Sequence, residues 1–95
     1  MVKFALEVHP GEILREQMEE LGLSANALGA QLGVPANRVS TILRGTRGIT
    51  ADTALRLGRF FGQTPEFWMN LQRTYDLVVT ERDIGSDLKR IRRVS

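Results

Sequence analysis

Residues 21–45 read LGLSANALGAQLGVPANRVSTILRG and contain two short amphipathic segments. The first is predicted to begin after Ser24, a preferred N-cap residue, and to end at Gly33. The second is predicted to begin at Pro35, which suits the first turn of a helix, and to end at Gly45. Each segment can bury only one narrow stripe, so the pair is typical of a helix-turn-helix. The predicted buried seam consists of Leu28, Leu32, Val34, Val39 and Ile42.

The first of these segments contains a glycine, Gly29, in its interior. In a helix-turn-helix the two helices cross nearly at right angles, so one position at the crossing must be small, and Gly29 fits that position. Glycine weakens a helix interior by roughly 1 kcal/mol relative to alanine. Alanine is expected to fit the crossing and to be more stable, so packing must offset the cost of Gly29.

Three further helices are predicted around these segments. One covers residues 10–21, another covers residues 51–61, and the last runs from residue 65 to about residue 79. Their apolar positions are Ile13, Leu14, Met18 and Leu21 in the first, Ala54, Leu55, Leu57, Phe60 and Phe61 in the second, and Phe67, Trp68, Leu71 and Tyr75 in the third. Beyond residue 79 the pattern weakens and Gly85 interrupts it, but Ile84, Leu88 and Ile91 keep a helical spacing, so residues 80–95 are expected to form a C-terminal helical extension. The predicted class is all-α, with five helices.

The composition indicates one ordinary folded domain. The chain has 95 residues, of which 42% are hydrophobic and 25% charged, so residues 1–95 are expected to share one core, centred on residues 8–79. There is no cysteine and only one histidine, His9, so we expect no metal site and no cofactor. No nucleophile, base and orienting group can be assembled, so we expect no catalytic residues and no enzyme. Without a signal peptide or an apolar run of about 18 residues, a cytoplasmic protein is expected, with no membrane partner.

The charges are unevenly distributed along the chain. Between Leu21 and Ala51 there is no acidic residue, whereas Arg38, Arg44 and Arg47 fall there. The preceding segment carries the acids Glu12, Glu16, Glu19 and Glu20. This distribution predicts a local positive zone that could meet nucleic acid, although chance clustering on a solvated face is an alternative.

The stretch at residues 21–45 resembles the helix-turn-helix of the phage-repressor-like (Xre/Cro) superfamily. In front of it stands VHPGEILREQ, and behind it GITADTALRLGRFFGQTPEFWMNLQRTYDL. These flanks resemble, more narrowly, the HigA-type antitoxins of host-inhibition-of-growth toxin-antitoxin modules. The resemblance covers about residues 8–79 and implies a five-helix, lambda-repressor-like DNA-binding domain. One departure is Gly29, where such proteins commonly have alanine.

The resemblance implies a sequence-specific DNA-binding antitoxin of a type II toxin-antitoxin module. Such a protein represses its own operon as a homodimer on double-stranded operator DNA, and it neutralises a HigB-type toxin, a RelE-like mRNA endonuclease. It would act in the bacterial cytoplasm, associated with the nucleoid when bound to DNA. Two alternatives remain open, a protein-interaction module that only blocks a toxin and a stand-alone Xre-type transcriptional regulator. A small basic toxin-like protein encoded next to this chain would favour an antitoxin over a lone regulator.

Within this fold, the second short helix lies in the major groove and its N-terminal residues meet base edges. If Val39 and Ile42 face inward, the base-reading residues are Ala36, Asn37, Arg38 and Thr41. Asn37 can pair with adenine and Arg38 with guanine. The predicted phosphate contacts are Ser24, Asn26, Ser40, Arg44, Thr46, Arg47 and Thr50. The alternatives are that Ser24 and Thr50 act only as N-caps and that Arg38 and Arg44 are ordinary solvated side chains.

Several remaining residues have structural interpretations. Trp68 is expected in the core rather than in an aromatic binding site, and His9 is expected to be a loop residue. Arg56, Arg59 and Arg73 are expected on solvated or partner-facing surfaces. The last helix or the C-terminal segment is expected to form the dimer interface, because its apolar residues exceed the needs of the core. These residues are Leu77, Val78, Val79, Ile84, Leu88 and Ile91.

Overall fold

A computed structural model describes residues 7–94, and these residues form an all-α fold with no strand. The helices are α2 (Pro10–Leu21), α3 (Ala25–Leu32), α4 (Ala36–Leu43), α5 (Ala51–Phe61) and α6 (Pro65–Leu88). For residues 7–94, the predicted class and the number of helices are confirmed. Within the described part of the chain, no helix has the length and apolar character needed to cross a membrane.

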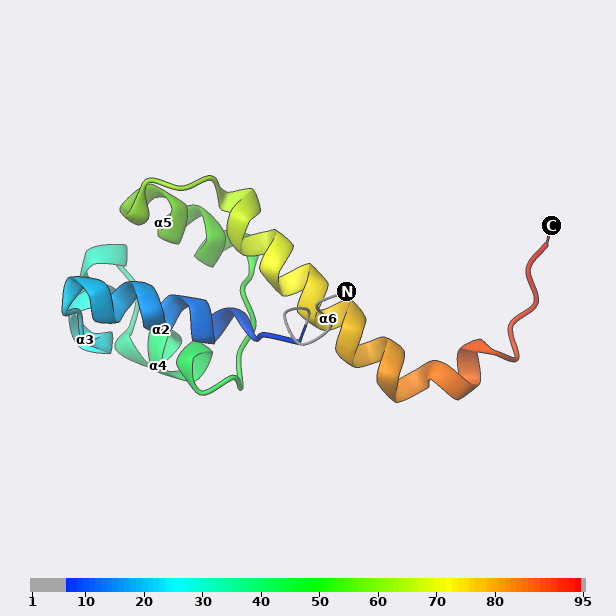
Figure 1. Cartoon of the computed structure of the whole chain (residues 1–95). Coiled ribbons are helices and arrows are strands. Elements are labelled where there is room, and N and C mark those ends of the chain that lie inside the picture. The colour runs from blue at the N-terminus through cyan, green and yellow to red at the C-terminus, as the bar shows by residue number, and fades with distance from the viewer. Residues whose placement is uncertain (1–6, 95) are drawn as a thin grey trace.

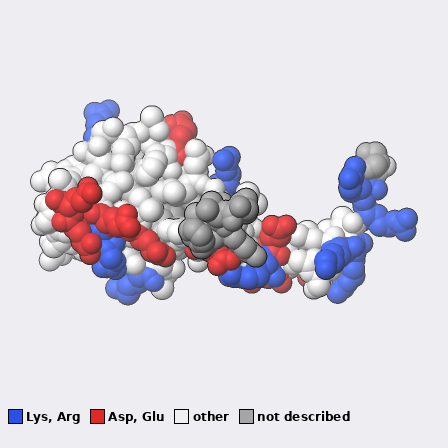
Figure 2. Space-filling model, in the orientation of Figure 1, with Lys and Arg blue, Asp and Glu red and all other residues white. Residues whose placement is uncertain are grey.

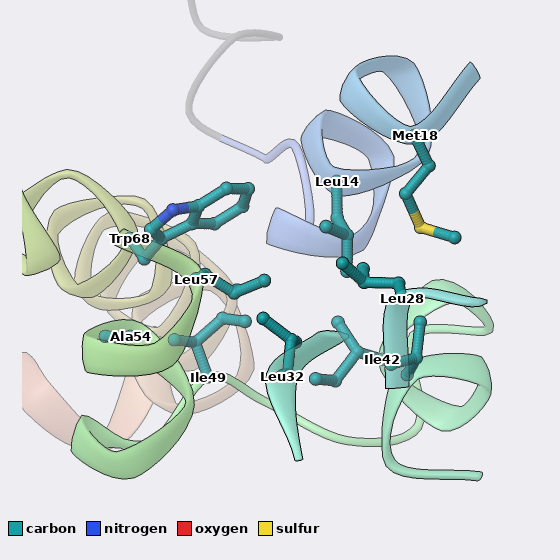
Figure 3. Packing of buried hydrophobic residues seen from close by; sticks show 10 residues of the cluster. Leu14, Met18, Leu28, Leu32, Ile42, Ile49, Ala54, Leu57 and Trp68 are labelled. Carbon is teal, nitrogen blue, oxygen red and sulfur yellow. The ribbon is translucent and has the colours of Figure 1, made fainter. Parts of the chain in front are cut away.

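The helices α2 to α5 and the first half of α6 form one globular unit, from which the rest of α6 projects (Figure 1). The chain is consequently elongated, with extents of 50 × 25 × 22 Å. Helix α3 packs on α4, and α5 packs on α6. The buried core draws on every helix, and Figure 3 shows most of its members side by side. The buried core consists of Leu14, Met18, Leu28, Leu32, Val39, Ile42, Ile49, Ala54, Leu57 and Trp68.

Helix ends follow the local signals of the sequence closely. Gly22, Gly33 and Gly62 adopt the left-handed conformation that ends α2, α3 and α5. Pro35 differs from its predicted place, because it is the N-cap of α4 and α4 itself begins at Ala36. The boundaries of the first four helices are therefore set by residues next to each boundary.

The structure departs from the predicted pattern at three places. Leu21 and Leu55 were expected in the core, but they are 58% and 61% exposed. Each lies on the edge of a helix whose buried stripe is narrower than its run of apolar residues. The predicted end of the last helix near residue 79 is also wrong, because α6 continues to Leu88 with a kink at Ile84, where φ is −112° and ψ is 17°. Trp68 lies in the core as predicted, with no exposed surface.

His9 lies outside the helices, as predicted, but it also has a structural role in the fold. It is the N-cap of α2, and its Nδ1 accepts a hydrogen bond from the backbone N–H of Gly11 at 2.9 Å. Its ring packs edge-on against Tyr75 of α6, with 4.9 Å between the ring centroids. Burial lowers the pKa of His9, although the carboxylates of Glu12 and Asp76 act in the opposite direction. His9 therefore holds the start of α2 against α6 in its neutral form.

The backbones of several helices meet at glycines. A Cβ on Gly29 would lie 2.9 Å from the carbonyl oxygen of Val34 and 3.2 Å from the Cα of Ala36. A Cβ on Gly11 would lie 2.1 Å from the carbonyl oxygen of Ile42. The expectation that position 29 must be small is confirmed, but the expectation that alanine fits there is wrong. Because the opposing atoms are backbone, α4 would have to shift to admit even a methyl group.

The G29A substitution is expected to lower the free energy of unfolding by about 1 kcal/mol. Overpacking costs about 1–3 kcal/mol, and the better helix propensity of alanine returns about 1 kcal/mol. Urea denaturation followed by circular dichroism measures the change. G85A is the control, because a Cβ there meets nothing within 4 Å, and it should leave stability unchanged or raise it. A G29A variant more stable than the wild type would contradict the close approach.

Protonation of His9 is expected to destabilise the fold. Because the folded-state pKa of His9 lies below its unfolded value of about 6.5, this contribution is fully present above that pH and is lost as the pH falls through the window below it. The measurement compares the melting temperatures of the wild type and H9N from pH 7.5 to 5.5, since asparagine is also a good N-cap but does not titrate. The advantage of the wild type over H9N should shrink as the pH falls. Two parallel curves would refute this role of His9.

Candidate nucleic-acid interface

Helix α4 buries one face and presents the other. Val39 and Ile42 are 2% and 1% exposed and point into the core. The predicted base-reading residues lie on the rest of the helix surface. Of these, Asn37 is exposed, whereas Ala36, Arg38 and Thr41 are half-buried. The structure therefore places all four on the part of α4 that the core does not cover.

The hydroxyl groups of Ser40 and Thr41, in the second half of α4, bond back to the helix. Thr41 Oγ1 donates to the carbonyl oxygen of Asn37 at 2.6 Å, and Ser40 Oγ donates to the same oxygen at 3.3 Å. Such bonds use the hydroxyl hydrogen within the helix. The methyl group of Thr41 is then the part that suits contact with a thymine methyl group, while Ser40 keeps only acceptor capacity.

The guanidinium of Arg38 is held by a carboxylate of another helix. Arg38 Nη1 donates to Asp52 Oδ2, and Arg56 Nε donates to the same oxygen at 2.9 Å. Arg56 Nη1 also donates to the carbonyl oxygen of Leu32 at 2.8 Å. The hydrogen bonds from Arg38 and then from Arg56 lower the pKa of Asp52. One carboxylate thus connects α4, α5 and the end of α3.

The sequence does not reveal the partners within this group. Arg56 is exposed, as expected, but its guanidinium also joins Asp52 to the carbonyl oxygen of Leu32. Asp52 was not singled out as a functional residue. The available signal was the spacing of Asp52 and Arg56 by four residues at the start of a helix, which is typical of an ion pair. The bond from Arg38 joins residues 14 apart, which no local pattern indicates.

Ser24 and Thr50 are N-caps, as their structural interpretation proposed. Ser24 Oγ accepts from the backbone N–H of Ala27 at 3.1 Å, and Thr50 Oγ1 accepts from that of Thr53 at 3.4 Å. These bonds begin α3 and α5 respectively. Both helix starts therefore present backbone N–H groups at the surface beside a polar oxygen, an arrangement that also favours an anion.

The other predicted phosphate contacts lie at two places on the surface. Asn26 is exposed in the first turn of α3. Arg44, Thr46 and Arg47 are exposed in the segment that follows α4, where Thr46 Oγ1 donates to the carbonyl oxygen of Thr41 at 3.2 Å. The structure thus groups these three residues directly after the C-terminal end of α4.

Asp52 lies beside α4, whereas the acidic side chains of α2 lie together elsewhere. Figure 2 shows the acidic side chains of α2 gathered over one face of the globular unit. Arg15 of the same helix reaches the end of α4, where its Nη2 donates to the carbonyl oxygen of Leu43 at 3.4 Å. Phosphates would be repelled from the exposed face of α2 and attracted to the segments on either side of α4.

Comparison with protein families identifies the fold. A family model described as a helix-turn-helix domain matches residues 11–67. Virulence-associated protein I of Dichelobacter nodosus is 53% identical over 77 residues, which are 80% of this chain and 71% of the relative.

Solved structures match over almost the whole chain. A HigA-family addiction-module antidote protein from Coxiella burnetii is 50% identical, with a TM-score of 0.89, and the match covers 92% of this chain and 97% of that one. The antitoxin HigA of Pseudomonas aeruginosa, solved with the higBA promoter, is 42% identical, with a TM-score of 0.90, and the match covers 94% of this chain and 99% of that one. The chain therefore belongs to the helix-turn-helix domain family, among the HigA-type antitoxins of the Xre/Cro-like superfamily.

Proposed function

We propose that this chain is a sequence-specific DNA-binding antitoxin that represses its own operon. The observation that carries the proposal is the placement of α4, whose exposed side chains lie opposite a buried face held by Val39 and Ile42. The likeness to a HigA antitoxin solved with promoter DNA supports it, since the two chains share 42% of their residues. In the proposed complex the outer part of α4 enters the major groove.

Roles within the complex follow from the chemistry of each side chain. Ala36, Asn37, Arg38 and Thr41 would meet base edges, with Asn37 suited to adenine and Arg38 to guanine. The proposed phosphate contacts come from the starts of α3 and α5 and from the segment after α4. They are Ser24, Asn26, Ser40, Arg44, Thr46, Arg47 and Thr50. A repressor of this kind would act in the cytoplasm, on the nucleoid.

The protein is proposed to bind DNA as a homodimer. One helix-turn-helix covers too little of a duplex for tight specific binding, whereas two copies can read half-sites about one turn apart. The second half of α6 projects from the globular unit (Figure 1). Apolar side chains of this segment are exposed. Leu77 is 64% exposed, Leu88 is 40% exposed, and Ile91 beyond the helix is 70% exposed. Pairing of two such segments would remove this apolar surface from water.

A HigB-like toxin is the proposed protein partner. The likeness to HigA-family antidote proteins supports this part of the proposal. A RelE-like mRNA endonuclease would be neutralised by forming a complex with this chain. Copurification of the chain with the product of the adjacent reading frame, followed by an mRNA cleavage assay, tests the pairing. Unchanged cleavage in the presence of this chain would contradict it.

Two substitutions are expected to affect DNA binding differently. N37A should remove about 1–3 kcal/mol of discrimination at one base pair in each half-site, because an adenine contact is lost. R47A should weaken binding to every duplex and reduce the slope of log affinity against log salt by about 1 per lost phosphate contact. Fluorescence anisotropy with a duplex from the region upstream of the chain's own gene measures both effects.

The control for this pair is R59A, which removes the same charge from the last turn of α5. It should change neither the base preference nor the salt slope appreciably. A scrambled duplex of the same composition serves as the non-specific reference. If the wild type binds the upstream and scrambled duplexes equally, sequence-specific repression is refuted, and a protein that only blocks a toxin becomes the better explanation.

Truncation after Thr80 is expected to convert the dimer into a monomer. The cut removes the distal part of α6 and its exposed Ile84, Leu88 and Ile91, while the core residues remain. Size-exclusion chromatography with light scattering measures the mass, and circular dichroism verifies that the shortened chain is folded. A folded, shortened chain that is still dimeric would place the interface elsewhere.

A further inference from the structure

Asp52 occupies an unusual place for an acidic residue in a protein that binds DNA. No acidic residue lies between Glu20 and Asp52 in the sequence, and the side chain of Asp52 is 52% exposed. It lies in the first turn of α5, next to the N-cap Thr50 and across from Arg38 of α4. A carboxylate there repels phosphates, so a requirement for tight binding to any DNA would disfavour it.

The hydrogen bonds of Asp52 define how Arg38 is held. Asp52 Oδ2 accepts from Nη1 of Arg38, which leaves the Nε and Nη2 hydrogens on the opposite edge of the guanidinium. Two parallel donors on one edge match the O6 and N7 acceptors of guanine. The carboxylate therefore engages Arg38 through Nη1 and leaves one pair of donors, Nε and Nη2, for bidentate recognition.

Asp52 is itself held from the other side. Arg56 Nε donates to Asp52 Oδ2 at 2.9 Å, and Arg56 Nη1 donates to the carbonyl oxygen of Leu32 at 2.8 Å. Leu32 is the last residue of α3, where helix carbonyl oxygens lack partners within the helix. A chain of hydrogen bonds thus runs from the backbone of α3 through Arg56 and Asp52 to Arg38. The guanidinium of Arg38 is thus linked to α5 through Asp52, and to the end of α3 through Arg56.

We propose that Asp52 is a positioning residue that orients Arg38 so that its Nε–Nη2 edge reads a guanine in the major groove. The proposal rests on the DNA-binding function proposed above. It adds a residue that touches no base and that acts only through Arg38. The Asp52 carboxylate weakens the attraction of this surface for phosphates. It raises selectivity at one base pair, because an ordered guanidinium loses less entropy on binding.

The opposite role would make Asp52 a restraint that withholds Arg38 from DNA. The two roles predict opposite changes when the carboxylate is removed. If Asp52 orients Arg38, D52A lowers the affinity for the operator duplex but not for a scrambled duplex. If Asp52 withholds Arg38, D52A raises both affinities, since a charge is lost and an arginine is released.

The test is a double-mutant cycle of D52A and R38A on the full chain. Affinity is measured by anisotropy for the upstream duplex, for its variants with each G·C pair replaced in turn by A·T, and for a scrambled duplex. D52A should reduce the preference for guanine about tenfold at the same base pair that R38A affects, and at no other pair. In the R38A background, D52A should leave the preference unchanged. E20Q, which removes an exposed acid on α2, is the charge control and should change no base preference.

Each outcome separates this proposal from the one on which it rests. A wild type that does not distinguish the upstream from the scrambled duplex refutes the DNA-binding function and the role of Asp52 together. A wild type that distinguishes them, with a D52A variant that keeps its guanine preference, refutes only the role of Asp52. Loss of preference at all base pairs, or a D52A effect that persists in the R38A background, also overturns positioning through Arg38.

Discussion

The arrangement of this protein depends on the close contact of backbones where α4 meets its neighbours. At Gly29, α3 approaches the start of α4 so closely that a methyl group would lie 2.9 Å from a carbonyl oxygen. At Gly11, α2 approaches the carbonyl oxygen of Ile42 near the end of the same helix, within 2.1 Å of where a methyl group would be. Helix α4 is thus held by backbone near both of its ends, and this fixes which of its residues face outward.

Charged side chains add further contacts between these helices. Arg15 of α2 bonds the carbonyl oxygen of Leu43, and Arg56 of α5 bonds the carbonyl oxygen of Leu32. Each arginine therefore partners the last turn of a short helix, α4 or α3, where carbonyl groups have no partner within the helix. Because α3 and α4 each have 8 residues, they depend on contacts with other helices, mainly through their buried faces, and these hydrogen bonds add to that packing. The Asp52 carboxylate then extends this network to the guanidinium that we propose to read DNA.

Features determined by neighbouring residues could be predicted from the sequence, and features determined by distant contacts could not. Gly22, Gly33 and Gly62 end their helices as expected, because a left-handed cap is a local requirement. The exposure of Leu55 and the hydrogen bonds of Arg56 depend on where α3 and α6 lie. The spacing of apolar residues in α5 carries no information about those positions. Within the candidate site, the outward placement of Asn37 followed from the helical period. The partner of Arg38 did not, because Asp52 is brought to it by the fold.

The central claim is that the outer part of α4 reads the DNA sequence. A two-dimensional ¹⁵N–¹H NMR titration tests it most directly, with the duplex from upstream of the chain's own gene and a scrambled duplex of equal length and composition. Signals of residues 36–41 should shift with both duplexes, and the difference between the two sets of shifts should be greatest there. Identical shifts with both duplexes, or differences confined to α6, would contradict the account.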